Sequence, residues 1–280
     1  MSHTLSLPLA RRSGAGWAGV AAIALLYAAM YGLNYWLPLQ STNYTTRIWD
    51  WSQAALSVAG GVAVLRYRRV LTPRTALIGL ALGLLSGLAH TLRDPSFWWN
   101  AWQGVGVWVC FAGGAVLFQA GAAPRIAGFE PPPARIAWSL AAGIALAIPL
   151  AIINNLYFYT TSGAVQIRNP FASAFAALSP GIHEEVIFRF FVLALCLHLL
   201  RYSTARRLAL IVAVGLAVVP HSLNHLPDLL LANPTMGIVM LMATCLLFGL
   251  PMAVLQVRRN LETAIAFHWW IDFVRFLFGF

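Results

Sequence analysis

The sequence predicts an all-α protein, a polytopic membrane bundle of eight to nine transmembrane helices. Hydrophobic residues make up 60% of the 280 positions, and charged residues make up only 9%. A soluble domain carries about 25% charged residues, so this composition excludes the soluble classes. Apolar runs long enough to cross a bilayer recur along the whole chain, and basic residues concentrate in alternate gaps between them.

Each expected helix corresponds to an apolar run, and about 20 residues are enough to span a bilayer. In chain order the runs occupy residues 17–39, 51–65, 75–92, 98–120, 136–158, 172–200, 208–225, 234–257 and 262–280. The run at 51–65 is shorter than the others, so it forms either a ninth span or a helix at the membrane interface. The gaps between the runs are short and contain prolines or arginines.

Arginine alone supplies the positive charge of the chain, because the sequence contains no lysine. With nine spans and the N-terminus inside, thirteen arginines fall in inside gaps and three in outside gaps. This positive-inside bias supports the ninth span and places Phe280 outside. The inside set is Arg11, Arg12, Arg66, Arg68, Arg69, Arg74, Arg125, Arg135, Arg201, Arg206, Arg207, Arg258 and Arg259, and the outside set is Arg47, Arg93 and Arg168.

The basic residues at the helix ends indicate contact with the lipid bilayer rather than with nucleic acid. Arginines beside apolar runs act as topology signals and as contacts to anionic lipid headgroups. The exclusive use of arginine is typical of a GC-rich prokaryotic genome. We therefore expect a multi-pass protein of the cell membrane, namely the inner membrane of a prokaryote.

Two adjacent glutamates, Glu184 and Glu185, interrupt the run at 172–200. An ionisable group inside a bilayer costs about 2.5–3.5 kcal/mol on insertion scales, so a residue of this kind is retained for a reason. Glu185 and Arg189 are four residues apart and share a helix face, where they can pair. Glu184 then points about 100° away and is free to face a cavity. The alternative is a buried ion pair that only locks helices together.

Two more polar pairs with helical spacing lie in later runs. His221 and His225 are four residues apart, and so are His268 and Asp272. Each pair therefore shares one face of its helix. Four further ionisable residues in apolar runs are expected to be structural (His90 and His198) or are ambiguous (His183 and Arg275).

Carboxylate and imidazole groups around one water can perform hydrolysis. A carboxylate and a histidine can deprotonate the water for attack on a carbonyl, and polar groups on a third helix can stabilise the oxyanion. The alternative chemistry is a zinc site with a bound water, built from Glu184, His221, His225 and His268. The soluble zincin signature HExxH is absent, so no metal or other cofactor is implied with certainty.

These residues resemble the motifs of the CAAX-protease and bacteriocin-processing (CPBP, or ABI) family of intramembrane endopeptidases. The family motif EExxxR is similar to the segment from Glu184 to Arg189. The motif FxxxH is similar to the segment ending at His225, with His221 in the phenylalanine place; in an alternative register His221 is the family histidine, after Ala217. The last motif, HxxxN or HxxxD, corresponds to His268 and Asp272.

The resemblance covers about residues 170–280 and implies a glutamate-dependent intramembrane endopeptidase. Its catalytic residues would be Glu184 and His225 on the water, with His268 and Asp272 holding the oxyanion or the water. The supporting residues would be Glu185, Arg189 and His221. The substrate would be a lipid-linked or tail-anchored membrane protein or peptide, cut near the membrane. Members of the family have been described both as metalloproteases and as metal-independent glutamic proteases.

This resemblance divides the chain into a catalytic transmembrane core at residues 171–280 and N-terminal transmembrane helices of unknown role at 1–170. Two other functions fit the buried charges. The first is a proton-coupled transporter that uses Glu184, Arg189 and the histidines as a relay. The second is a non-catalytic membrane scaffold or immunity protein on the same fold.

The depths of these residues along their helices argue against one shared active site. At about 1.5 Å per residue from the inside arginines, Glu184 and His225 lie some 25 Å up, whereas His268 lies only about 13 Å up. Straight, upright helices would keep these residues apart. Kinks at Pro180, Pro220 and Pro251, or a deep turn at Arg258-Arg259, would bring them together.

Overall fold

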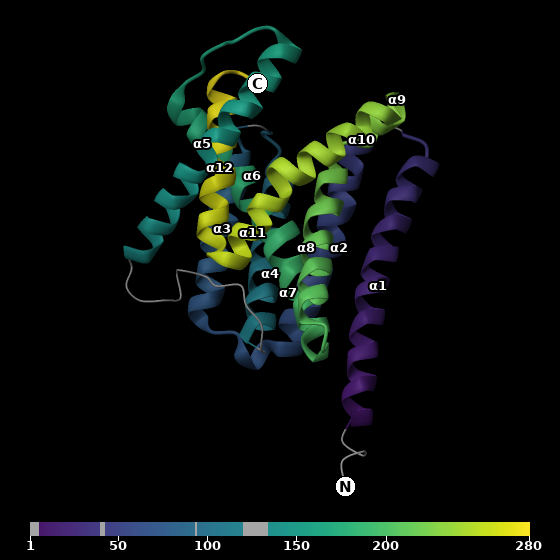
Figure 1. The fold of residues 1–280 in the computed structure, drawn as a ribbon. Helices are drawn as coiled ribbons and strands as arrows, with labels where there is room; N and C mark the ends of the chain where they lie inside the picture. The colour runs from purple at the N-terminus through teal and green to yellow at the C-terminus, as the bar shows by residue number, and fades with distance from the viewer. Residues whose placement is uncertain (1–5, 40–42, 93, 120–133) are drawn as a thin grey trace.

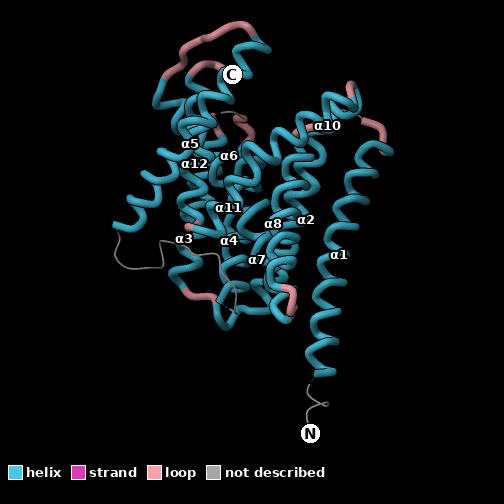
Figure 2. The backbone as a smooth tube through the Cα atoms, in the orientation of Figure 1, coloured by secondary structure: helices cyan, strands magenta, loops and turns pink. Residues whose placement is uncertain are grey.

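The computed structural model describes residues 6–39, 43–92, 94–119 and 134–280. Throughout these ranges the chain is helical, with short connecting loops and no strand (Figure 2). The predicted all-α fold is therefore confirmed. Five helical stretches are long and apolar enough to cross a membrane: Ser13–Trp36, Phe97–Phe118, Ala134–Thr161, Arg206–Asn224 and Pro234–Arg258. The count of eight to nine spans stays a prediction.

Every predicted run coincides with a helical stretch. The N-terminal half contains α1 (Ser6–Trp36), α2 (Tyr44–Tyr67), α3 (Pro73–His90), α4 (Phe97–Gln119) and α5 (Ala134–Ser162). The second half contains α6 (Pro170–Glu184), a π-helical turn (Glu185–Phe191), α7 (Val192–Leu199), α8 (Arg206–Asn224), α9 (Pro227–Ala232), α10 (Pro234–Ala243), a second π-helical turn (Thr244–Gly249), α11 (Leu250–Arg258) and α12 (Leu261–Leu277). The short run at 51–65 is part of α2, a helix of 24 residues that packs against α4.

Local sequence signals explain where many of these helices begin. A side-chain oxygen of the residue before the helix accepts a hydrogen bond from a backbone N–H of the first turn, which satisfies a donor that the helix itself cannot. Three of these caps are followed at once by proline, whose missing N–H costs nothing at the first helical position. The capping residues are Asn43, Thr72, Asn169, Asn233 and Asn260.

The helices form one bundle, in which α1 begins at one end and the C-terminus lies at the opposite end (Figure 1). The terminal helix α12 packs mainly against α5 and α6, and α4 packs against α2, α3 and the first π-helical turn. Glycines permit two of these close approaches: a Cβ at Gly83 would collide with the backbone of Gly104 in α4, and one at Gly143 would collide with that of Thr263 in α12. Small residues serve the same purpose at helix contacts in membranes generally.

Seven of the arginines predicted to lie inside are found at one end of the bundle. The turn after α2 holds Arg66, Arg68, Arg69 and Arg74, and the turn before α8 holds Arg201, Arg206 and Arg207; both turns lie at the end where α1 begins (Figure 1). Arg93 and Arg125 lie outside the described residues. The membrane orientation itself stays a prediction.

The structure resolves the mismatch in depth between His268 and the other site residues. The turn between α11 and α12 lies partway up the bundle, well above the turn that joins α7 to α8 (Figure 1). Because α12 starts from this raised turn, seven residues lift His268 to the level of Glu184. The two π-helical turns, which follow Pro180 and precede Pro251, add a local widening of the kind often found at functional sites.

Candidate active site

Glu184 is the centre of a polar cluster that joins three helices. It ends α6, where the helix passes into the π-helical turn. Its Oε2 atom lies 2.8 Å from His221 Nε2, 3.7 Å from His268 Nε2 and 3.8 Å from His225 Nε2. The side chain of Glu184 is 13% exposed, so it is almost buried but still open on one side. The structure thus brings together Glu184, His225 and His268, as the sequence led us to expect.

The two histidines of α8 occupy different environments. The His221 side chain is buried, and its Nδ1 atom lies 3.0 Å from Arg189 NH2. A guanidinium group can only donate, so Nδ1 must accept, and a neutral His221 then carries its proton on Nε2. That proton is donated to Glu184. The His225 side chain, at the C-cap of α8, is 43% exposed.

Glu185 lies on the other side of the helix and is fully buried. Its Oε1 atom pairs with Arg189 NH1, as predicted from the spacing, and also accepts a hydrogen bond of 2.8 Å from His268 Nδ1. Its Oε2 atom accepts a 2.9 Å hydrogen bond from Gln256 Nε2 of α11. Glu185 therefore uses both oxygens to hold other side chains in place and does not face the open side of the cluster.

The last pair, on α12, continues the network toward the C-terminus. His268 Nε2 lies 3.4 Å from Asp272 Oδ2, and Arg275 NH2 donates to Asp272 Oδ1 over 3.1 Å. Because Nδ1 of His268 is bound to Glu185, only Nε2 is directed at Glu184 and Asp272. The ambiguous Arg275 is thus a member of the same network.

A cavity of about 440 Å³ opens on this cluster. It lies between α5, α8, α9, the α10–α11 helix and α12, and it is large enough for water and part of a peptide chain. Its polar wall contains all the clustered residues except Glu185: Glu184, Arg189, His221, His225, His268, Asp272 and Arg275. The remaining wall is mainly apolar, with Leu226, Leu229, Met240, Leu247, Phe248 and Met252 among its members.

A tryptophan of α2 also belongs to the site, although no motif in the sequence singles it out. The half-buried Trp49 ring packs edge-to-face against His225 (centroids 4.9 Å apart), Phe188 (4.8 Å) and His221 (5.3 Å). An aromatic residue in an apolar run normally signals packing, so no local pattern could have marked it. Gln256 was missed for a similar reason, because a single amide in a helix has no motif around it.

The remaining histidines of the described residues have structural partners. His183 Nε2 lies 2.9 Å from Gln53 Oε1, His90 Nδ1 lies 2.7 Å from Asn100 Oδ1, and His198 Nε2 lies 2.9 Å from the Tyr67 hydroxyl. Both residues expected to be structural, His90 and His198, make such contacts. His183 is buried and links α6 to α2, so it supports the wall behind Trp49.

A metal ion is the alternative occupant of the cluster. Ligand atoms of Glu184, His221 and His225 lie within 4.8 Å of one another, close enough to surround one ion. However, the Arg189 donor at Nδ1 of His221 leaves the proton on Nε2, the nitrogen that a zinc ion would need as a lone pair. This hydrogen-bond pattern does not fit zinc binding through His221.

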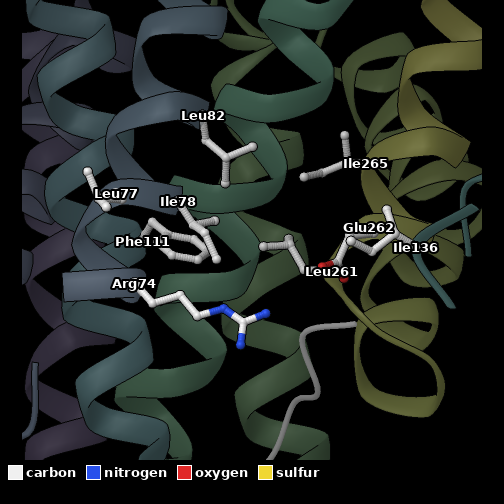
Figure 3. A pocket seen from close by; sticks show the side chains of 9 residues that line it. All are labelled: Arg74, Leu77, Ile78, Leu82, Phe111, Ile136, Leu261, Glu262 and Ile265. Carbon is white, nitrogen blue, oxygen red and sulfur yellow. The ribbon is translucent and has the colours of Figure 1, made fainter. Parts of the chain in front are cut away.

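A second, larger pocket of about 620 Å³ lies away from this cluster (Figure 3). Residues of α3 and α4, including Leu77, Leu82 and Phe111, form one wall, and Leu261 and Ile265 of α12 belong to the opposite one. Arg74 and Glu262 also line the pocket. It contains none of the candidate catalytic residues, so its larger size does not make it the active site.

Residues 166–274 match the protein-family model described as type II CAAX prenyl endopeptidase Rce1-like. This segment, which covers less than half of the chain, is similar to a CAAX protease domain. The comparisons with curated proteins and with solved structures gave no significant match. The matched segment contains Glu184, both histidines of α8 and the His268–Asp272 pair, and the described chain has several helices able to span a membrane. Trp49 and Arg275 lie outside the matched segment.

Proposed function

We propose that this protein is an intramembrane endopeptidase in which Glu184 activates a water molecule for attack on a peptide bond. One observation carries the proposal. Glu184 faces the cavity with three histidine ring nitrogens within 3.8 Å of one oxygen, while the neighbouring Glu185 is already paired with Arg189. The carboxylate of Glu184 is thus available for the reaction, whereas that of Glu185 is occupied by its structural contacts.

The hydrogen bond from His221 fixes the catalytic carboxylate. His221 donates to Oε2, which leaves Oε1 free to accept from a water in the cavity. The partly exposed His225, beside Glu184, makes a second hydrogen bond to that water. Glu184 takes one proton as the water oxygen attacks the carbonyl carbon, and the same proton then passes to the leaving amine as the C–N bond breaks.

The α12 pair stabilises the oxyanion on the other side of the substrate carbonyl. In its doubly protonated form His268 donates through Nδ1 to Glu185 and through Nε2 toward the developing negative charge. An ionised Asp272 can only accept hydrogen bonds, so it cannot itself donate to an oxyanion. We assign Asp272 the role of orienting His268, a role in which Arg275 supports it.

The same geometry supports the metal-independent form of the reaction. The contact between Arg189 and His221 makes Nε2 of His221 a donor to Glu184 rather than a metal ligand. Chelators are therefore expected to leave the rate unchanged. In this proposal residues 171–280 form the catalytic core, and the helices before them support it and complete the cavity wall.

The cavity favours a substrate with an apolar part. Leu226, Leu229 and Met240 line it together with Tyr157 and Phe158 of α5, so a lipid-linked or apolar-tailed peptide can enter from the bilayer. Elements that line the cavity, among them the C-terminal end of α8 and α9, lie in the half of the bundle opposite the arginine-rich turns (Figure 1). With those turns facing the cytoplasm of a prokaryotic cell, the active site would lie in the outer half of the inner membrane.

The test is cleavage by the purified chain in proteoliposomes. The probe is a quenched-fluorescence peptide with a farnesylated cysteine followed by three residues, and its twin lacks the lipid. The proposal predicts cleavage of the lipidated peptide next to the cysteine, no effect of a strong chelator, and no cleavage by Glu184→Gln. Chelator inhibition that zinc reverses would establish the metal form. Proton transport without any cleavage would establish a transporter instead.

A further inference from the structure

The second pocket, of about 620 Å³, lies apart from the catalytic cluster and takes no part in the proposed hydrolysis. Its walls come from α3, α4, α5 and α12, and its lining is apolar except for Arg74 and Glu262. The pocket opens to the outside of the bundle, because its lining residues Leu77 and Ile136 are 64% and 37% exposed. In a membrane protein this opening faces lipid.

The two charged groups lie at one end of the pocket and come from opposite walls. Arg74 belongs to the first turn of α3 and Glu262 to the first turn of α12. In Figure 3 the guanidinium group and the carboxylate lie below the side chains of Leu82 and Ile265, which form the upper part of the pocket. The pocket therefore has a polar end with both signs of charge and an apolar end with neither.

The length of the pocket matches one leaflet of a bilayer. Leu82 follows Arg74 by eight residues on α3, which corresponds to a rise of about 12 Å. The hydrocarbon core of a bilayer is about 30 Å thick, so one leaflet takes about 15 Å. Arg74 also belongs to an arginine-rich turn at one end of the bundle (Figure 1). The polar end thus lies at the level of the lipid headgroups and the apolar end at the level of the acyl chains.

We propose that the second pocket binds one phospholipid whose headgroup carries a primary ammonium group, as in phosphatidylethanolamine. The phosphate pairs with Arg74, whose planar donors fit phosphate oxygens. The ammonium group donates to the carboxylate of Glu262, and the acyl chains lie along Leu77 and Leu82. Basic pockets between membrane helices bind lipid headgroups in this way generally. This inference does not depend on the proposed endopeptidase function.

The opposite charges of the polar end select this headgroup over two common ones. A choline headgroup has the same two charges, but its quaternary nitrogen has no N–H to donate to Glu262. A glycerol headgroup has no positive charge, so the anionic lipid would place its only charge between a favourable Arg74 and an unfavourable Glu262. Lipids with identical acyl chains and these three headgroups therefore separate the contributions of Arg74 and Glu262.

The experiment adds phosphatidylethanolamine, phosphatidylcholine and phosphatidylglycerol in equal amounts to the purified full chain in detergent and counts bound lipid by native mass spectrometry. The wild-type protein should retain one phosphatidylethanolamine in preference to the other two by about 10-fold, the usual effect of a hydrogen bond between charged groups. Glu262→Gln should remove most of the preference over phosphatidylcholine. Arg74→Gln should lower the retention of all three lipids by about 10-fold. Arg69→Gln, at an exposed position in the turn before α3, is the matched control and should change neither result.

A further variant leaves both charges in place and so tests the apolar part of the pocket. Leu77→Trp adds bulk at an exposed lining position, and it should lower the retention of all three lipids while the melting temperature without lipid stays unchanged. Equal retention of the three lipids by the wild-type protein would overturn the inference. So would a preference for phosphatidylethanolamine that survives in Glu262→Gln, or a preference for phosphatidylglycerol, because the arginines alone would then attract lipid.

Discussion

The matched protease segment and the helices that precede it contribute different things to one site. Residues 166–274 supply the candidate acid and base groups, including Glu184, His221 and His268. Among the described residues, α1 and α2 supply no ionised group to this cluster, yet they hold the helix that carries His221 and His225. The comparison shows that motifs mark the chemistry of a membrane enzyme, while the geometry depends on residues that belong to no motif.

A row of tyrosines on α1 holds the end of α8. The Tyr27 hydroxyl lies 2.7 Å from the Pro220 carbonyl oxygen and 2.7 Å from Asn224 Oδ1. Tyr31 donates to the Leu223 carbonyl oxygen, one turn further along. The last carbonyl groups of a helix have no partner within it, and in a bilayer no water replaces one. The tyrosines therefore anchor the segment that carries His221 and His225.

The second helix reaches α8 and α9 from another side. Trp49 contacts both histidine rings, as described above. Near the start of α2, the backbone N–H and hydroxyl of Thr45 donate to Asp228 Oδ2 over 2.9 and 2.6 Å, and the Tyr44 N–H donates to Oδ1 over 3.3 Å. Asp228 lies three residues after His225, so these hydrogen bonds fix the chain just beyond the segment that carries His221 and His225.

The largest effect is expected within the protease segment itself. Arg189→Ala leaves the fully buried Glu185 without its charge partner and His221 without its Nδ1 donor. Removing one member of a buried ion pair costs about 3–5 kcal/mol, so the protein should lose abundance and thermal stability as well as activity. Arg207→Ala, at an exposed position in the same segment, is the matched control. Normal abundance and activity of Arg189→Ala would show that the cluster is held in some other way.

Substitution of Trp49 tests whether the N-terminal helices position the catalytic groups. Trp49→Ala should lower kcat by about 10–100-fold with little change in KM, because a small misplacement of reacting groups is costly. His221 should also become reactive toward diethyl pyrocarbonate, which mass spectrometry detects without an activity assay. Trp49→Phe should restore most of the rate, since it keeps an aromatic ring against the histidines.

The control for Trp49 is Trp98→Ala, which removes a ring that is 81% exposed. It should change neither the rate nor the histidine reactivity. If Trp49→Ala behaves like Trp98→Ala in both measurements, the first two helices only pack against the site and do not shape it.

A smaller effect is expected at Asp228, which lies outside the expected spans. Burial acts to raise the pKa of Asp228, but the hydrogen bonds from Thr45 and Tyr44 lower it overall. A carboxyl group whose pKa is lower when folded stabilises the protein above its unfolded pKa of about 3.9, and this stability is lost as the pH falls through the folded value. Asp228→Asn should therefore cost about 1 kcal/mol at neutral pH, the usual value of a helix cap.

The pH dependence separates this contact from general damage. The difference in thermal stability between Asp228→Asn and the wild-type protein should be present at pH 7, should shrink as the pH falls below about 4, and should vanish below the lowered folded pKa, where the wild-type carboxyl is protonated too. A difference that persists unchanged at low pH would show that the charge of Asp228 does not hold the contact.

Much of the fold could be predicted because membrane helices follow simple rules of length and polarity. The run at 234–257, for example, corresponds to the continuous stretch Pro234–Arg258. The pairing of Glu185 with Arg189 followed from spacing alone. The depth of His268 in the bundle could not be predicted, because it depends on the raised turn between α11 and α12, which is a tertiary feature (Figure 1).

The choice between the two histidines of α8 illustrates the limit for the site. The motif allows two registers, one with His225 as the family histidine and one with His221. In the structure His221 lies closer to Glu184, whereas His225 is the more exposed of the two. Their difference arises from Arg189 and Trp49, which come from other helices. No local pattern contains that information, so only the assembled helices distinguish them.

The central claim is that Glu184 is catalytic whereas the adjacent Glu185 is structural. A side-by-side measurement of Glu184→Gln and Glu185→Gln tests it most directly. Glutamine keeps the volume of glutamate but cannot take a proton from water. We expect Glu184→Gln to be as stable as the wild-type protein and to lose about 10²–10⁴-fold or more in cleavage of the farnesylated peptide. Glu185→Gln should lose thermal stability and retain more activity. Wild-type cleavage by Glu184→Gln would contradict the account.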